Sequence, residues 1–102
     1  MSASIAVIGT LSFPVQNIAK ILPHLKTLVE ATRLHDNCLA YDVALDPFED
    51  GLIRFSELWP DRQSLESHLK APHIEPWRNI AKRHGLKDRQ FMSYEITHPK
   101  AV

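Results

Sequence analysis

Glu57 lies between two aromatic residues, Phe55 and Trp59, and His68 and His73 follow shortly after it. In a strand the side chains alternate between two faces, so Glu57 would share one face with both aromatic side chains. A carboxylate on a face that packs against the core needs a partner, or its pKa rises until it is neutral. A carboxylate, an indole and two imidazoles in an apolar setting therefore predict a small-molecule pocket.

The role of Glu57 stays open between two interpretations. In one, the carboxylate is a base with a raised pKa, or it orients a histidine. In the other, it is a structural group that fixes the following helix to the sheet. In both, we expect a buried hydrogen-bonded pair between Glu57 and one of His68 or His73, while the other histidine borders the pocket.

The spacing of the two histidines argues against a metal site. His68 and His73 are separated by Pro72, so they do not share a helical face as the histidines of zinc-binding helices do. No cysteine or carboxylate cluster lies beside them in the sequence. The chain has 3 glycines and no phosphate loop, nucleophile elbow or dinucleotide fingerprint, so we expect neither a metal nor an organic cofactor.

Aromatic side chains could form the walls of the predicted pocket. Tyr41 and Trp59 are able to stack on a phenolic ring or hydrogen-bond to it, and Phe55 shares their face. Large aromatics also dominate protein cores, so packing alone is an equally good interpretation for these residues. For Trp77 we expect packing.

Periodic patterns place these residues in a βαββαβ order. Residues 5–13 alternate as a strand, and residues 17–34 carry an apolar helical stripe in which Pro23 predicts a kink or a new helix start. Residues 39–45 and 52–59 alternate as two further strands, joined by a turn-rich segment.

The second helical region should consist of two pieces. Asp61 is the expected N-cap of a short helix whose buried pair would be Leu65 and Leu69. Pro72 ends that helix, a second one follows with Pro76 in its first turn and Gly85 at its close, and a last strand runs through residues 92–96.

This order predicts one domain over residues 1–102 with an α+β, ferredoxin-like fold. Two crossovers around a central hairpin give a four-stranded antiparallel sheet with helices on one face. The helices should cover the face that carries Leu39, Tyr41, Phe55 and Trp59. The other face is too apolar to leave in water, which predicts a homodimer through a partner sheet. Its residues include Ala6, Ile8, Ala40, Ala44, Leu52 and Leu58.

Charge and cysteine content exclude several classes of protein. The 12 basic residues balance 12 acidic ones, so we expect no binding to nucleic acid or to an anionic membrane. No apolar run approaches the length of a membrane span, and the N-terminal residues lack the pattern of a signal peptide. The single cysteine, Cys38, cannot form an internal disulfide, which favours a reduced, cytoplasmic setting.

Three segments resemble motifs of the antibiotic biosynthesis monooxygenase domain. They are Asn-Cys-Leu-Ala-Tyr at 37–41, Glu-Leu-Trp at 57–59 and His-Leu-Lys-Ala-Pro-His at 68–73. The resemblance covers nearly the whole chain in the same element order, and it implies a dimeric α/β barrel with a pocket between each sheet and its own helices. The family usually has glycine where Asn37 stands, but asparagine tolerates the left-handed conformation that closes helices.

The resemblance implies more than one activity. Some members oxygenate quinols or polyketide phenols with dioxygen and no metal or flavin, while others degrade haem, isomerise small phosphorylated signals or have no assigned activity. The haem-degrading branch uses an asparagine in its first strand, and residues 5–13 contain none, which makes haem degradation less favoured.

Two functional hypotheses follow. The first is a cofactor-independent monooxygenase that uses dioxygen on a quinol or a polyphenolic, polyketide-type aromatic. Its catalytic residues would be Glu57, His68 and His73, and its substrate-binding residues Tyr41, Phe55 and Trp59. The alternative is a dimer of the same fold that binds or isomerises a small molecule without oxygenase activity.

Overall fold

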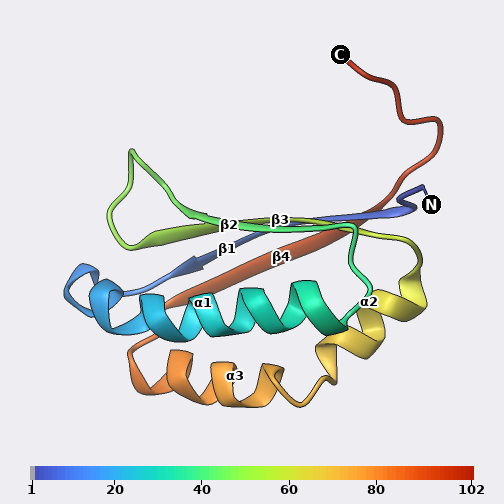
Figure 1. Ribbon diagram of the computed structural model, residues 1–102. Coiled ribbons are helices and arrows are strands. Elements are labelled where there is room, and N and C mark those ends of the chain that lie inside the picture. The colour runs from blue at the N-terminus through green and yellow to red at the C-terminus, as the bar shows by residue number, and fades with distance from the viewer. Residues whose placement is uncertain (1) are drawn as a thin grey trace.

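The computed structural model describes residues 2–102 and contains a four-stranded antiparallel sheet with helices on one side (Figure 1). The strands are β1 (Ile5–Ser12), β2 (Ala40–Leu45), β3 (Leu52–Trp59) and β4 (Asp88–Glu95), in the order β2-β3-β1-β4. The helices are α1 (Ile18–His35), α2 (Arg62–Leu69) and α3 (Ile74–Arg83), and a 3-10 turn (Val15–Asn17) precedes α1. The predicted α+β, ferredoxin-like βαββαβ fold is confirmed.

Strand β1 lies at the centre because it pairs antiparallel with both β3 and β4 along its whole length. The register places Gly9 opposite Phe55 on one side and opposite Phe91 on the other. A Cβ atom on Gly9 would lie 2.2 Å from the ring of Phe91, so that ring occupies the space above the glycine. Gly9 thus lets an aromatic side chain of β4 lean over β1, where it meets Phe55 with ring centroids 5.1 Å apart.

Helix α1 is continuous through Pro23, so the alternative in which a new helix starts there is wrong. The missing N–H of Pro23 leaves the carbonyl group of Ala19 without its helical partner, and Ala19 is exposed, so water can hydrogen-bond that carbonyl group. The apolar stripe faces the sheet and buries Ile21, Leu25 and Leu28. None of the helices within residues 2–102 is long and apolar enough to cross a membrane.

Two predictions about helix ends are confirmed, and one about the buried face of α2 is wrong. Asp61 caps α2, since its Oδ1 accepts a hydrogen bond from the backbone N–H of Ser64 at 2.7 Å. Asn37 follows α1 in the left-handed region, at a φ of 63°. The buried residues of α2 are Leu65 and His68, whereas Leu69 is 39% exposed, so His68 takes the inward position that was predicted for Leu69.

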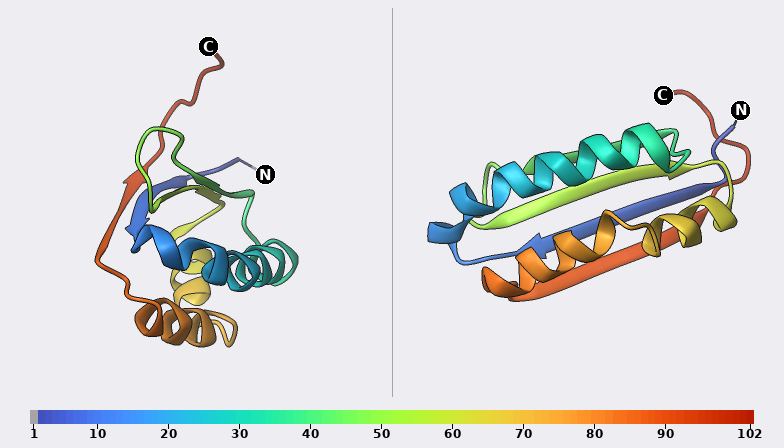
Figure 2. Two further views of the ribbon diagram at one scale, coloured as in Figure 1. Left: turned by 90° about the vertical axis from the view of Figure 1, so that its left-hand side faces the viewer. Right: turned by 60° about the horizontal axis from the view of Figure 1, so that its bottom comes forward.

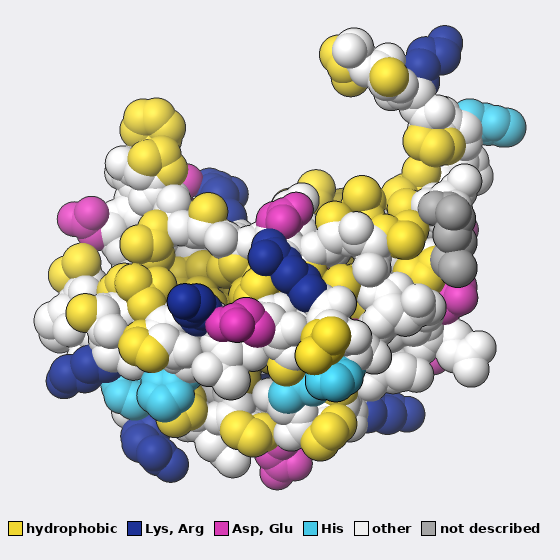
Figure 3. Space-filling model, viewed as in Figure 1, with side chains coloured by type: hydrophobic (Ala, Val, Ile, Leu, Met, Phe, Trp, Pro, Cys, Tyr) yellow, Lys and Arg dark blue, Asp and Glu magenta, His cyan; other side chains and the backbone are white. Residues whose placement is uncertain are grey.

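The two faces of the sheet differ in how they are covered. Tyr41, Phe55 and Trp59 lie under the helices as predicted, but Leu39 precedes β2 and is 42% exposed. The other face has no layer over it (Figure 2). It leaves several large apolar side chains in water, and hydrophobic atoms are visible along this upper side of the molecule (Figure 3). They include Ile8, Leu58, Met92 and Tyr94, while Leu52, also predicted there, is buried.

Candidate active site

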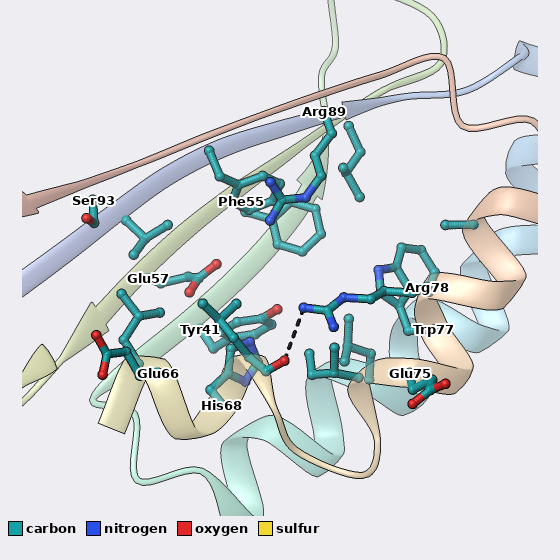
Figure 4. Close-up of a pocket in the computed structure, with 18 of the residues that line it drawn as sticks. Tyr41, Phe55, Glu57, Glu66, His68, Glu75, Trp77, Arg78, Arg89 and Ser93 are labelled. Atoms are coloured by element: carbon teal, nitrogen blue, oxygen red, sulfur yellow. Dashed lines mark hydrogen bonds between the residues drawn. The ribbon is translucent and has the colours of Figure 1, made fainter. Parts of the chain in front are cut away.

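A cavity of about 840 Å³ lies between the sheet and the helices α2 and α3 (Figure 4). In Figure 2, α2 and α3 run alongside β4 as two separate pieces, with a bend between them. Strands β1, β3 and β4 provide one wall, and the two helices provide the other. The apolar part of the lining is rich in aromatic side chains, among them Tyr41, Phe55, Trp77 and Phe91.

Glu57 lies on the sheet wall of this cavity and is 4% exposed. Its Oε1 accepts a hydrogen bond from the indole Nε1–H of Trp59 at 2.9 Å. Burial raises the pKa of Glu57 to about 7, although the Trp59 hydrogen bond and the positive charge of Arg89 oppose the rise. The expected pair between Glu57 and a histidine is therefore wrong: the partner is Trp59, the next residue on the same face of β3.

Both histidines instead contact Asp36, the residue that ends α1. One carboxylate oxygen of Asp36, Oδ2, accepts from Nδ1 of His68 at 2.6 Å and from Nε2 of His73 at 2.6 Å. The side chains are 7% (Asp36), 4% (His68) and 16% (His73) exposed. We call this group the Asp36 triad. It joins the end of α1 to α2 and to the start of α3. The spacing of these residues in the sequence did not predict this contact.

The Asp36 triad determines which nitrogen of His68 can accept a proton. Because Nδ1 donates to Asp36, the neutral ring carries its lone pair on Nε2. Burial lowers the pKa of His68, while Asp36 acts in the opposite direction. His68 lines the cavity and packs against Tyr41 and Trp59, with ring centroids 5.3 Å and 4.9 Å away. The site therefore holds an imidazole with a fixed tautomer that can accept a proton.

Tyr41 faces the same cavity as a hydrogen-bond donor. It is 3% exposed, and burial raises the pKa of its phenol, so the hydroxyl group keeps its proton across the physiological range. The nearby carboxyl group of Glu57 acts in the same direction on the pKa of Tyr41. A neutral phenol O–H beside a neutral imidazole suits recognition of an oxygen atom on a bound ring.

The ligand atoms of the Asp36 triad lie within 4.8 Å of one another, as a metal centre would require. However, Oδ2 is only 2.6 Å from each nitrogen. Two donors bound to one zinc ion at bond lengths of about 2.1 Å would be separated by roughly 3.4 Å. The short contacts are those of hydrogen bonds, so the residues present do not fit a metal in this arrangement.

Three arginines also line the cavity, and the sequence analysis did not identify them. Arg62 donates from Nη1 to Oγ of Ser93 at 2.8 Å, and Arg78 donates from Nη2 to the carbonyl oxygen of Leu69 at 3.1 Å. The guanidinium carbon of Arg89 lies 4.5 Å from the ring centroid of Phe91. We call them the rim arginines; only the fold brings together their positions on α2, α3 and β4.

The structure thus separates the predicted site residues into two groups. Tyr41, Phe55, Glu57 and His68 line the cavity. Trp59 is fully buried behind it, and His73 lies behind His68 as part of the Asp36 triad. These two support residues that face the cavity. Trp77, for which only packing was predicted, is 9% exposed and forms part of the lining.

Comparison with known proteins places the chain in a family. Residues 4–79 match the family model described as antibiotic biosynthesis monooxygenase. That segment includes β1 to β3, both residues of the Glu57–Trp59 pair and the whole Asp36 triad. No curated protein sequence matches the chain.

Solved structures support the same assignment. A Deinococcus radiodurans protein named for the antibiotic biosynthesis monooxygenases is 26% identical, with a TM-score of 0.89 over 96% of this chain and 97% of that one. Another structure, named antibiotic biosynthesis monooxygenase, is 30% identical, with a TM-score of 0.84 over 91% and 98%. A Bacteroides thetaiotaomicron protein of unknown function shares the fold at 19% identity, with a TM-score of 0.81 over 94% and 100%.

Proposed function

The chain belongs to the antibiotic biosynthesis monooxygenase family, and we propose that it is a cofactor-independent monooxygenase acting on an electron-rich quinol or polyphenolic ring. One observation carries the proposal: a neutral imidazole with its acceptor nitrogen available and a carboxyl group with a pKa of about 7 line one aromatic cavity. Groups that titrate near the working pH are the ones that transfer protons efficiently.

In the proposed reaction, a phenolic hydroxyl group of the substrate gives its proton to Nε2 of His68. The resulting anion is electron-rich and gives electrons to dioxygen directly, after which a carbon–oxygen bond forms on the ring. One oxygen atom stays on the ring, the other leaves as water, and the quinol supplies the electrons as it becomes a hydroxyquinone. Glu57 would return a proton to the departing oxygen, because its carboxyl group is partly protonated near pH 7.

The remaining residues would position these two groups and keep water out. Asp36 and His73 hold His68 in one tautomer, and Trp59 holds Glu57. In this proposal His73 and Trp59 are therefore positioning residues, which replaces the direct roles that we expected for them. Tyr41 would donate a hydrogen bond to an oxygen atom of the substrate, and Phe55 and Trp77 would pack against its ring.

We propose a homodimer formed through the uncovered face of the sheet. Ile8 and Met92 are each 60% exposed there, and Tyr94 is 49% exposed. Covering apolar surface gains about 25 cal/mol for each Å². Light scattering at micromolar concentration should give twice the mass of the 11.7 kDa chain. A monomeric mass would contradict the dimer without affecting the reaction.

We also propose a cytoplasmic location. The support is Cys38, which is a free thiol in the structure and has its pKa raised, chiefly by burial. A free thiol that is not activated is typical of a reducing compartment. Fractionation of the source cells would test this.

A second candidate function rests on the same two groups. A base and an acid that face one cavity could move a proton between two positions of a ligand, which would make the protein an isomerase or a binding protein. This alternative needs no dioxygen. It is favoured if ligands bind but oxygen is not consumed.

Oxygen uptake with a panel of hydroquinones and polyphenols tests the proposal. We expect the wild-type protein to raise the rate above autoxidation without added metal, flavin or nicotinamide. His68→Gln should remove most of the increase, whereas His24→Gln, at an exposed position of α1, should leave it unchanged. A panel that binds without any rise in oxygen uptake would overturn the oxygenase and support the alternative.

A further inference from the structure

The three rim arginines have positive charges that no acidic side chain neutralises locally. Within residues 2–102, none of the guanidinium groups of Arg62, Arg78 and Arg89 has a carboxylate oxygen within 4.0 Å. By contrast, Arg33 and Arg54 do have such partners, Asp42 and Asp46, elsewhere on the surface. Within the described part of the chain, the three arginines at the cavity therefore have no ion pair, and among the other arginines only Arg83, outside the lining, shares this property.

Each rim arginine is held by a neutral group that leaves most of its donors available. Arg62 uses one donor on Ser93, Arg78 uses one on the carbonyl group of Leu69, and Arg89 stacks over Phe91. A guanidinium group has five N–H donors in a planar fork that matches a carboxylate or a phosphate. Neutral anchors fix the position of such a fork and do not cancel its charge.

Two of these groups reach into the cavity itself. In Figure 4, Arg78 extends from α3 and Arg89 from β4, and they approach the centre of the cavity from opposite walls. Their charges act on the groups assigned to proton transfer: Arg89 lowers the pKa of Glu57, and Arg78 lowers the pKa of His68. Glu57, His68, Arg78 and Arg89 all line this one cavity, so a ligand in contact with Glu57 and His68 would also be near both arginines.

The acidic residues of the lining do not balance this charge. Glu57 has a pKa of about 7, so near neutral pH it carries only part of a negative charge. Glu66 and Glu75 line the cavity at its rim, and Figure 4 shows their carboxylates turned away from Arg78 and Arg89. Lys82 adds a further positive charge to the lining.

We propose that Arg78 and Arg89 form an anion subsite, and that the ligand of the cavity is an aromatic compound carrying an acidic oxygen group, a carboxylate or a phosphate. The aromatic ring would lie against Phe55 and Trp77, and the acidic group would lie between the two guanidinium groups. This inference rests on the proposed function for the position of the ring. It adds a substrate class that the family assignment does not specify.

Calorimetric titration in the absence of oxygen measures this preference apart from any reaction. The probes are 2,5-dihydroxybenzoate, its uncharged methyl ester and hydroquinone monophosphate. We expect the carboxylate or the phosphate to bind about tenfold more tightly than the ester, because charge-assisted contacts replace weak ones. The more tightly bound acid identifies which oxygen group the subsite takes. Equal binding of the ester and both acids would overturn the proposal.

Variants assign the preference to the arginines. Arg78→Gln and Arg89→Gln should each weaken binding of the acid about five- to tenfold and leave the ester almost unchanged. Arg83→Gln is the matched control, since Arg83 is an exposed arginine of α3 outside the cavity lining. If Arg83→Gln weakens acid binding as much as the other two, general charge attraction explains the preference and the subsite is wrong.

The same probes separate this inference from the proposed function. Oxygen uptake with the ester but no preference for acids would leave the oxygenase intact and remove the anion subsite. Tight, arginine-dependent binding of an acid without any oxygen uptake would support the anion subsite and contradict the oxygenase.

Discussion

Asp36 and Glu57 are both carboxylates with little exposed surface, and the chain surrounds them in different ways. Asp36 accepts hydrogen bonds from two imidazole rings on one oxygen, at 2.6 Å each. Glu57 accepts one, from the indole of Trp59, and burial raises its pKa to about 7. The first carboxylate is surrounded by hydrogen-bond donors, whereas the second has too few to keep it fully ionised near neutral pH.

Their positions in the fold explain the difference. Asp36 lies where the end of α1 meets α2 and the start of α3, so donors from two other elements converge on it. Glu57 lies in the middle of β3, where backbone groups are used by the sheet and the neighbours on its face are aromatic. At the junction of the helices, Asp36 therefore has a structural role. On the sheet, Glu57 is a group that changes its protonation near neutral pH.

The largest effect should come from removing Asp36. Asp36→Ala leaves two buried imidazole N–H groups without an acceptor, and we expect a loss of about 3–4 kcal/mol in the free energy of unfolding. Asp36→Asn keeps an acceptor and should lose less. Asp42→Ala removes an exposed ion pair and should cost less than about 1 kcal/mol. Urea denaturation measures all three, and an Asp36→Ala loss no larger than that of Asp42→Ala would refute the structural role.

The next largest effect should be a dependence of the free energy of unfolding on pH, caused by the titration of Glu57. A carboxyl group whose pKa is raised by folding contributes stability that is fully present below the unfolded pKa, 4.5, and is lost as the pH rises through about 7. The wild-type protein should therefore lose up to about 3 kcal/mol over this range relative to Glu57→Gln, which does not titrate. His68 contributes equally to both proteins and cancels. A constant difference between pH 4.5 and 8 would show that the pKa of Glu57 is not raised.

Removing the side chain of Glu57 should have an intermediate effect. At pH 5, where the group is protonated, Glu57→Ala leaves the Trp59 indole N–H unpaired and should cost about 1–3 kcal/mol. Glu57→Gln keeps an oxygen acceptor for that N–H and should cost less. Thermal unfolding at pH 5 compares the two. If both variants melt at the wild-type temperature, the Glu57–Trp59 hydrogen bond contributes nothing to the fold.

The smallest effect should follow from Trp59→Phe. The Trp59 hydrogen bond lowers the pKa of Glu57, so losing it should move the titration of Glu57 to higher pH. The position is fully buried, so ligand affinity should change little. We would follow the Glu57 carboxyl carbon by NMR through a pH titration. An unchanged midpoint with weakened ligand binding would instead support the stacking role first expected for Trp59.

Local patterns predicted most of the fold because each element follows from neighbouring residues. Alternation of apolar residues marked the strands, Asp61 marked the start of α2 and Asn37 the end of α1. The same reasoning allowed a new helix start at Pro23, which is wrong because exposure to water makes the missing hydrogen bond tolerable. It also failed at Leu69, where a histidine takes the inward position of the helix.

The candidate site was less predictable than the fold because its contacts are long-range. Glu57, His68, Tyr41 and Phe55 could be identified as cavity residues from their types and faces. The partner of the histidines could not, since Asp36 is 32 positions from His68 and resembles an ordinary helix end. The rim arginines had no local signal either: arginine on a helix or strand is usually a solvated surface residue.

The size of the cavity depends on Gly9, a residue that no ligand would touch. The ring of Phe91 fills the space over this glycine, and Arg89 stacks on that ring. A methyl group at position 9 would displace the ring and the arginine together, so a single change in the central strand would alter both the size and the charge placement of the site. A substitution at Gly9 would therefore change the selectivity for larger or smaller compounds while every residue of the lining stays the same.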